Sequence, residues 1–113
     1  MQKEYKLKKR ASFNYIYRKG TVFSNDDFVL YTVKTKGTLK VGFSVSKKVG
    51  GSVQRNRVKR QMRESVRLMI SEITPGYNII FVARSTVYGK KSSVIADSMR
   101  SLLKKAGLLG HSL

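Results

Sequence analysis

The chain is 113 residues long and carries 24 lysines and arginines against six acidic residues, for a net charge of +18. Its hydrophobic content of 41% is too high for a disordered basic tail, and its length allows one hydrophobic core. The absence of cysteine excludes a disulfide framework and a thiolate zinc site, and it fits a reducing compartment.

Residues 1–10 form a basic segment without hydrophobic periodicity, so we expect an extended N-terminal arm. No apolar segment follows this arm, and it is therefore not a secretory signal. No apolar run in the chain approaches the roughly 18 residues that span a bilayer, so we expect no membrane contact. These features predict a soluble protein of the cytoplasm.

Apolar residues then recur with helical spacing between Ser12 and Gly20, which predicts a short helix capped by Ser12. An Asn-Asp-Asp turn precedes residues 28–33, whose β-branched and aromatic side chains predict a strand. After a further turn, residues 39–46 alternate between apolar and polar side chains. This alternation predicts a strand with one buried face.

A glycine pair interrupts the chain at residues 50–51, and Ser52 is placed to cap a long amphipathic helix that runs to about Ile73. A Pro-Gly pair ends this helix. Residues 77–83 are almost continuously apolar, which predicts a strand in the middle of a sheet.

The last predicted helix is capped by Ser92 or Ser93 and ends at Gly107. Its single acid lies early and its lysines lie late, as the helix dipole favours. We expect residues 107–113 to be a frayed tail.

The order of elements is therefore helix, two or three strands, long helix, strand and helix. It predicts one domain, residues 1–113, of the α+β or α/β class, with helices packed on a small sheet of about four strands. Residues 39–46, 52–73 and 77–83 form a strand–helix–strand unit. By default such a unit is parallel with a right-handed crossover.

Projection of residues 52–73 at about 100° per residue separates an apolar stripe from a basic one. The apolar stripe must face the sheet and consists of Val58, Met62, Val66, Met69 and Ile73. The neighbouring stripe consists of Asn56, Arg60, Arg63 and Arg67, with Lys59 at its border. Arg55 projects toward the apolar side, where it either belongs to a frayed first turn or reaches past the edge of the core.

The basic stripe predicts an anionic partner outside the chain. Like charges one turn apart destabilise a helix by about a few tenths of a kcal/mol per pair, and Glu64 is the one acid close enough to offset them. A nucleic-acid backbone fits best, because guanidinium groups bind phosphate oxygens in pairs and each contact releases a counterion. A solvated basic face is the alternative interpretation.

The run SVSKKVGGSVQRNRVKRQMRE, residues 44–64, strongly resembles the RNR signature of the bacterial ribonuclease P protein component. The resemblance extends in order over nearly the whole chain. It includes a Leu-Lys-Lys before a Phe-x-x-x-aromatic helix, a Phe-Val-Leu-Tyr strand and an Ile-Ile-Phe-Val-Ala-Arg strand. One departure is Gly51-Ser52, where the family usually shows Asn-Ala, and it leaves the RNA contacts of this loop open.

The resemblance implies an accessory protein subunit of an endoribonuclease that removes the 5′ leader from precursor tRNA. Its implied partners are the catalytic RNA subunit and the single-stranded leader, without an obligate protein partner. The catalytic site and its Mg²⁺ requirement belong to the RNA, and we expect no metal bound tightly by the polypeptide. The resemblance also implies a left-handed strand–helix–strand crossover, contrary to the default.

Two sets of residues match the functional positions of the family. The implied contacts to the catalytic RNA are Lys47, Lys48, Arg55, Asn56, Arg57, Lys59, Arg60 and Arg63, and the basic stripe adds Arg67. The implied leader cleft is lined by Phe13, Tyr17, Val29 and Tyr31.

Physical chemistry supports the second set independently, because bases stack on aromatic rings with about 1–3 kcal/mol per base. Phe13 and Tyr17 lie one helical turn apart, and Val29 and Tyr31 share one face of a strand. Ordinary core packing is the alternative, and for Phe13 alone we would favour it. The tyrosine hydroxyls favour a partly exposed groove.

The sequence assigns no catalytic residue. Asp26 and Asp27 are consecutive and rarely point at one ion, while His111 lies in the expected tail. Gly50-Gly51 is only a weak phosphate-binding signal. A structural rRNA-binding protein of the ribosome is the alternative function, and such a protein would bury its aromatic residues.

Overall fold

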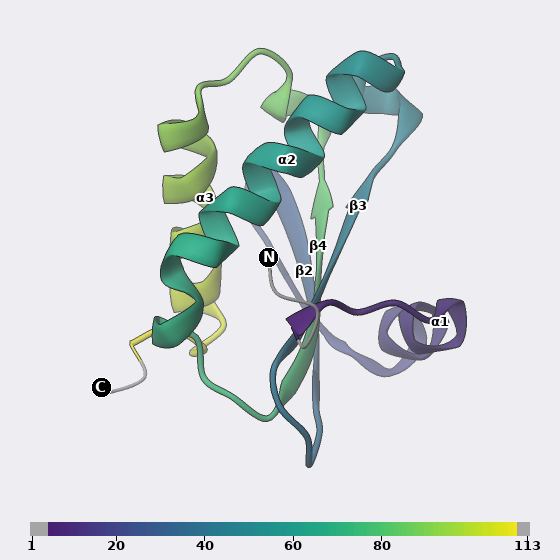
Figure 1. The fold of residues 1–113 in the computed structure, drawn as a ribbon, viewed down its shortest axis with the longest axis vertical. Coiled ribbons are helices and arrows are strands. Elements are labelled where there is room, and N and C mark those ends of the chain that lie inside the picture. The colour runs from purple at the N-terminus through teal and green to yellow at the C-terminus, as the bar shows by residue number, and fades with distance from the viewer. Residues whose placement is uncertain (1–4, 111–113) are drawn as a thin grey trace.

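The computed structural model describes residues 5–110 and shows three helices around a four-stranded sheet (Figure 1). The elements are α1 Arg10–Lys19, β1 Thr21–Ser24, β2 Phe28–Lys34, β3 Lys40–Val45, α2 Ser52–Met69, β4 Tyr77–Ala83 and α3 Ser92–Lys105. The strand order is β1-β2-β4-β3. β4 pairs in parallel with β3, whereas the β1–β2 and β2–β4 pairs are antiparallel. The predicted α+β class and the central position of residues 77–83 are confirmed.

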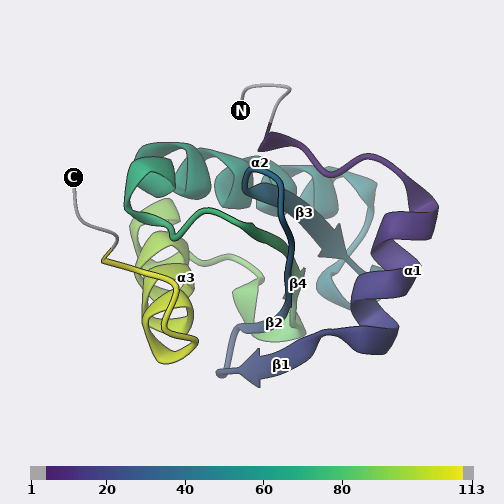
Figure 2. The same ribbon diagram turned by 90° about the horizontal axis from the view of Figure 1, so that it is seen from below.

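The two faces of the sheet are covered unequally. Helices α2 and α3 lie on one face and α1 lies alone on the other (Figure 2). The main core fills the space between the sheet and α2 and α3, and it includes Phe28, Leu30, Met62, Phe81 and Met99. A much smaller buried cluster, Leu7, Ile16 and Ile80, holds α1.

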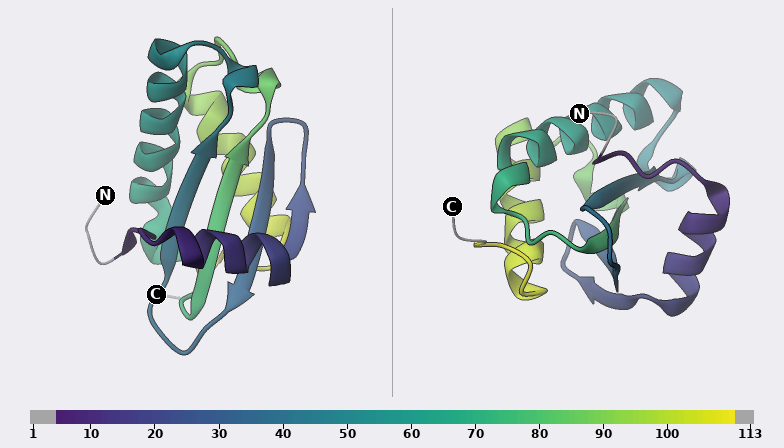
Figure 3. Two further views of the ribbon diagram at one scale, coloured as in Figure 1. Left: turned by 90° about the vertical axis from the view of Figure 1, so that its right-hand side faces the viewer. Right: turned by 60° about the horizontal axis from the view of Figure 1, so that its bottom comes forward.

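The β3–α2–β4 crossover is left-handed. Figure 3 (left) views the sheet from the side of α1, with β3 to the left of β4 and both strands running upward, while α2 packs against the opposite face. Viewed from the α2 side with the strands running upward, the chain therefore moves leftward from β3 to β4, which defines a left-handed crossover. The default right-handed crossover, which holds in about 98% of such units, is wrong here, and the expectation from the family resemblance is confirmed.

Helix boundaries differ from the sequence-based expectations by a few residues. α1 begins at Arg10 with Lys9 as its N-cap, so Ser12 lies inside the helix. α2 begins at Ser52 with Gly51 as its N-cap, and it changes to a short 3-10 turn at Ile70 before Ile73. α3 begins at Ser92, and its N-cap is Lys91 rather than a serine. No side chain donates or accepts a capping hydrogen bond at these three helix starts.

The N-terminal arm is extended, but it is attached to the sheet. Lys6 forms an isolated parallel bridge with Val41 of β3, and the Leu7 N–H donates to the Val41 carbonyl oxygen at 3.0 Å. The Leu7 side chain is buried. Residues 1–4 of the expected arm lie outside the described residues.

The C-terminal segment differs from the expected frayed tail at Leu108 and Leu109. Leu108 is buried, its carbonyl accepts from the Thr74 N–H at 2.8 Å, and Leu109 forms an antiparallel bridge with Ile73. Residues 111–113, including His111, lie outside the described residues.

A polar network connects the β1–β2 turn with α3, where Asn25 Nδ2 donates to the Ser98 carbonyl oxygen at 3.0 Å, and with the segment before α3. Asn25 Oδ1 accepts from the backbone N–H groups of Asp27 and Phe28 at 3.0 and 2.8 Å. Burial raises the pKa of Asp27, but hydrogen bonds from Lys90 (2.6 Å) and Thr86 (2.8 Å) outweigh it and hold the pKa below its usual value.

Candidate nucleic-acid interface

The sequence pattern of α2 fixes which side of the helix faces solvent. The predicted apolar stripe is buried throughout, and it consists of Val58, Met62, Val66, Met69 and Ile73. Gln61 and Ser65 extend the buried side toward α3, where Gln61 Nε2 donates to Ser92 Oγ at 3.1 Å. The remaining side of α2 carries nearly all of its charge.

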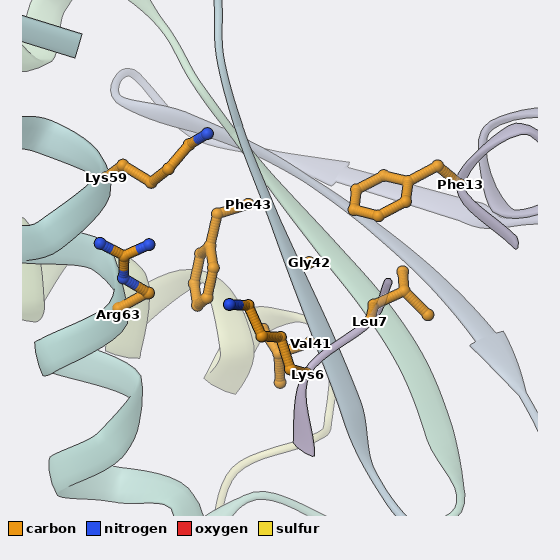
Figure 4. A pocket seen from close by; sticks show the side chains of 8 residues that line it. All are labelled: Lys6, Leu7, Phe13, Val41, Gly42, Phe43, Lys59 and Arg63. Carbon is orange, nitrogen blue, oxygen red and sulfur yellow. The ribbon is translucent and has the colours of Figure 1, made fainter. Parts of the chain in front are cut away.

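The basic residues of α2 occupy two flanks rather than one stripe. Lys59 and Arg63 turn toward β3, where they line a pocket with Phe43 (Figure 4). Arg57 and Arg60 line a second pocket on the α3 side. The solvent-facing half of the helix therefore presents cations over a broad surface.

Few of these cations are neutralised within the chain. In residues 5–110 the ion pairs are Arg67 with Glu64, Lys90 with Asp27, and Arg100 with Glu72. Arg67 is thus the one predicted RNA-binding residue with a carboxylate partner in that range. Arg55 is partly buried, and its Nε lies out of contact with solvent without a hydrogen-bond partner.

Lys47 and Lys48 lie in a 3-10 turn, Lys47–Val49, between β3 and α2. Both side chains are exposed. The chain then reverses at Gly50, whose φ of 151° disfavours any other residue. A Cβ at Gly50 would also come within 3.0 Å of the Gln54 Cβ. This turn brings the two lysines close to the start of α2.

Three of the four predicted leader residues form one aromatic surface. The rings of Phe13 and Tyr17 are 6.4 Å apart, and Tyr17 meets Tyr31 edge-on at 4.9 Å. Val29 lies two residues from Tyr31 on the same face of β2 and is half-buried. Tyr17 is 37% exposed, whereas Phe13 and Tyr31 are partly buried against the α1 cluster.

Sequence reasoning missed Lys6 and Phe43, which line the same pocket as Lys59 and Arg63. Lys6 belongs to the arm, where no periodicity indicated a position. The alternation of β3 placed Phe43 on the core-facing side, and its position at the sheet edge depends on which strand β3 pairs with. Neither the pairing of β3 with β4 nor the attachment of the arm to β3 can be predicted from local sequence.

The interface has the chemistry of an RNA-binding surface: unpaired guanidinium and ammonium groups beside partly exposed aromatic rings. Within residues 5–110 no group of three or more His, Cys, Asp or Glu side chains is placed to hold a metal ion. No helix of that range is long and apolar enough to cross a membrane.

Comparison with known proteins agrees with an RNA-binding surface. The family model described as Ribonuclease P matches residues 1–107. The ribonuclease P protein component of Clostridium acetobutylicum is 46% identical over 110 residues, which cover 95% of this chain and 92% of that protein.

Solved structures agree with this result. The RNase P protein of Staphylococcus aureus is 38% identical, with a TM-score of 0.87 over 95% of this chain and 99% of that one. The RNase P protein of Thermotoga maritima is 26% identical, with a TM-score of 0.81 over 88% of this chain and 96% of that one. The chain therefore belongs to the ribonuclease P protein family, and it is an accessory subunit of a tRNA-processing endoribonuclease rather than a structural protein of the ribosome.

Proposed function

We propose that the chain holds two RNAs on two separate surfaces, the catalytic RNA along α2 and the single-stranded 5′ leader of precursor tRNA along the aromatic surface. The observation that carries this proposal is the position of the two surfaces. Unpaired cations of α2 lie on one side of the sheet, and Phe13, Tyr17 and Tyr31 lie with α1 on the other. One protein can therefore contact both partners at once.

The catalytic RNA is a folded polyanion, and α2 offers it a rigid array of cations. The helix is fixed by its buried stripe, so its exposed side chains are displayed at helical spacing. The proposed RNA contacts are Lys47, Lys48, Arg55, Asn56, Arg57, Lys59, Arg60, Arg63 and Arg67. Arg67 is the weakest candidate, because Glu64 already neutralises part of its charge.

The leader is single-stranded, so its bases are free to stack. Tyr17 offers exposed ring surface, and its edge-on contact with Tyr31 orients both rings. Phe13 and Val29 border this surface. Stacking of this kind tolerates different bases, which suits a protein that handles leaders of many sequences.

The Mg²⁺ requirement of the reaction is part of the proposal, and we assign it to the RNA. The donor set of the described polypeptide does not fit a Mg²⁺ site, because no three of its His, Cys, Asp or Glu side chains lie together, and Asp27, Glu64 and Glu72 each pair with a cation. The cytoplasmic location expected from the absence of cysteine is also part of this proposal.

Reconstitution tests the function directly. The protein is mixed with the catalytic RNA and precursor tRNA at low Mg²⁺, and cleavage of the 5′ leader is measured with and without protein. We expect the protein to stimulate cleavage, and to stimulate it more for a long leader than for a leader shortened to one nucleotide. Stimulation that is absent, or equal for both substrates, would contradict the two-surface proposal.

A further inference from the structure

A pocket of about 320 Å³ lies where α2 faces the open edge of β3 (Figure 4). Four segments contribute to it: the N-terminal arm, α1, β3 and α2. Its lining residues are Lys6, Leu7, Phe13, Val41, Gly42, Phe43, Lys59 and Arg63.

The pocket concentrates positive charge. The ammonium groups of Lys6 and Lys59 and the guanidinium group of Arg63 surround the ring of Phe43 (Figure 4). The lining contains no acidic residue, and within residues 5–110 these three cations belong to no ion pair. An anion bound between them would relieve their mutual repulsion.

The edge of β3 adds polar backbone groups. Val41 turns its carbonyl away from β4 and accepts from the Leu7 N–H. Alternate residues of a strand direct their backbone groups to the same edge, so Phe43 also turns its N–H and carbonyl outward. The bridge between the arm and β3 is isolated and involves Lys6 and Val41, so the arm does not pair with β3 at Phe43.

The pocket is continuous with the aromatic surface. The ring of Phe13 lies over Gly42, where a Cβ would come within 2.6 Å of the ring. The same ring is 6.4 Å from the Tyr17 ring. Phe13 therefore belongs to both the pocket and the aromatic surface. A single-stranded nucleic acid that leaves the aromatic surface at Phe13 would reach the edge of β3 next.

We propose that this edge pocket binds one nucleotide of the single-stranded leader, with its phosphate between Lys6, Lys59 and Arg63 and its base against Phe43. The inference rests on the proposed function. A single strand is favoured over the catalytic RNA as the occupant, because a flexible strand follows the turn from Phe13 around the sheet edge and a duplex does not. With this occupant, Lys59 and Arg63 move from the proposed contacts with the catalytic RNA to contacts with the leader. Arg57 and Arg60, on the α3 flank of α2, remain with the catalytic RNA.

The test uses Lys6→Gln in the reconstituted ribonucleoprotein, with precursor tRNAs whose leaders increase by one nucleotide at a time. Lys36→Gln is the matched control, because it removes the same charge from an exposed turn between β2 and β3. Wild-type stimulation of cleavage in the same series checks the proposed function separately.

We expect Lys6→Gln to weaken substrate affinity by about three- to tenfold, which corresponds to one lost phosphate contact, and to lower the salt slope by about 0.7. The loss should appear only beyond a threshold leader length, while affinity for the catalytic RNA alone stays unchanged. Phe43→Leu, checked for folding by thermal unfolding, should show the same threshold.

Three outcomes would overturn the inference. Lys6→Gln could match Lys36→Gln at every leader length, it could weaken binding equally at all lengths, or it could weaken binding of the catalytic RNA instead. The last result would place catalytic RNA in the pocket. In each case an intact wild-type response would leave the proposed function standing.

Discussion

Replacement of Arg60 by alanine should weaken binding of the catalytic RNA with little cost to the fold. Arg60 is exposed and takes part in none of the ion pairs among the described residues. Its removal should change the free energy of unfolding by no more than about 0.5 kcal/mol, as at other surface positions. It also relieves repulsion from Arg57, one turn away on the same flank.

The expected effect on binding follows from the chemistry of a guanidinium on a phosphate. A charge-assisted hydrogen-bonded contact contributes roughly 1.5–3 kcal/mol, so its loss raises the Kd about 10- to 150-fold at low salt. Because one phosphate contact is lost, the slope of log K against log salt concentration should become shallower by about 0.9.

The assay is equilibrium binding of the protein to the catalytic RNA over a series of monovalent salt concentrations. Arg100→Ala is the control, because Arg100 is an exposed arginine of α3 that pairs with Glu72 at 2.9 Å. It removes the same charge outside the proposed interface. An unchanged salt slope for Arg60→Ala, or equal effects of the two variants, would refute a direct phosphate contact.

Three further predictions concern the aromatic surface, the polar network and the sheet edge. Tyr31→Val should weaken affinity for long leaders by about 1–3 kcal/mol and leave catalytic-RNA affinity unchanged; equal loss of both in binding assays would contradict separate surfaces. Because the pKa of Asp27 is lowered in the fold, its carboxylate stabilises the protein above its usual pKa of about 4 and loses this contribution as the pH falls through the lower folded value. Asp27→Asn should therefore lower the free energy of unfolding at pH 7 by about 1–2 kcal/mol, since Lys90 is partly exposed, and urea titrations should show this difference shrinking with acidification rather than staying constant. Gly42→Ala should cost about 1–3 kcal/mol by displacing the ring of Phe13, and Gly37→Ala, which meets no atom within 4 Å, is the control whose equal loss would disprove this cause.

The local periodicities of the sequence predicted the main elements and the orientation of α2. Val58, Met62 and Val66 recur at the spacing that one helix face requires, and all three are buried. Burial of one face is a local property of the pattern, so the sequence alone was sufficient. The strand at residues 77–83 was likewise recognised, because a central strand is apolar on both faces.

Features that depend on distant pairing were not predictable from these patterns. β1 spans four residues, three of them exposed, so it shows no alternation that local reasoning could detect. The attachment of Leu7 to Val41 depends on a free edge of β3, which exists because β3 is an outer strand of the sheet with β4 as its one neighbouring strand. Crossover handedness had no local signal either, and only the family resemblance indicated it.

The sequence predicted which residues belong to the candidate site better than it predicted how they are arranged. The basic residues of α2 were identified, but their division into two flanks follows from where β3 and α3 pack against the helix. Lys6 was missed for the same reason, since it reaches the pocket through a strand contact made by the arm.

The attachment of α1 by a buried cluster of three residues has a consequence for the proposed leader surface. Leu7, Ile16 and Ile80 are separate from the main core, so α1 is held by far less apolar contact than α2 or α3. A perturbation that loosens this cluster would separate Tyr17 from Tyr31 and leave α2 in place. Under the proposed division of surfaces, the protein would then keep its affinity for the catalytic RNA and lose affinity for the leader, so the two affinities are free to evolve independently.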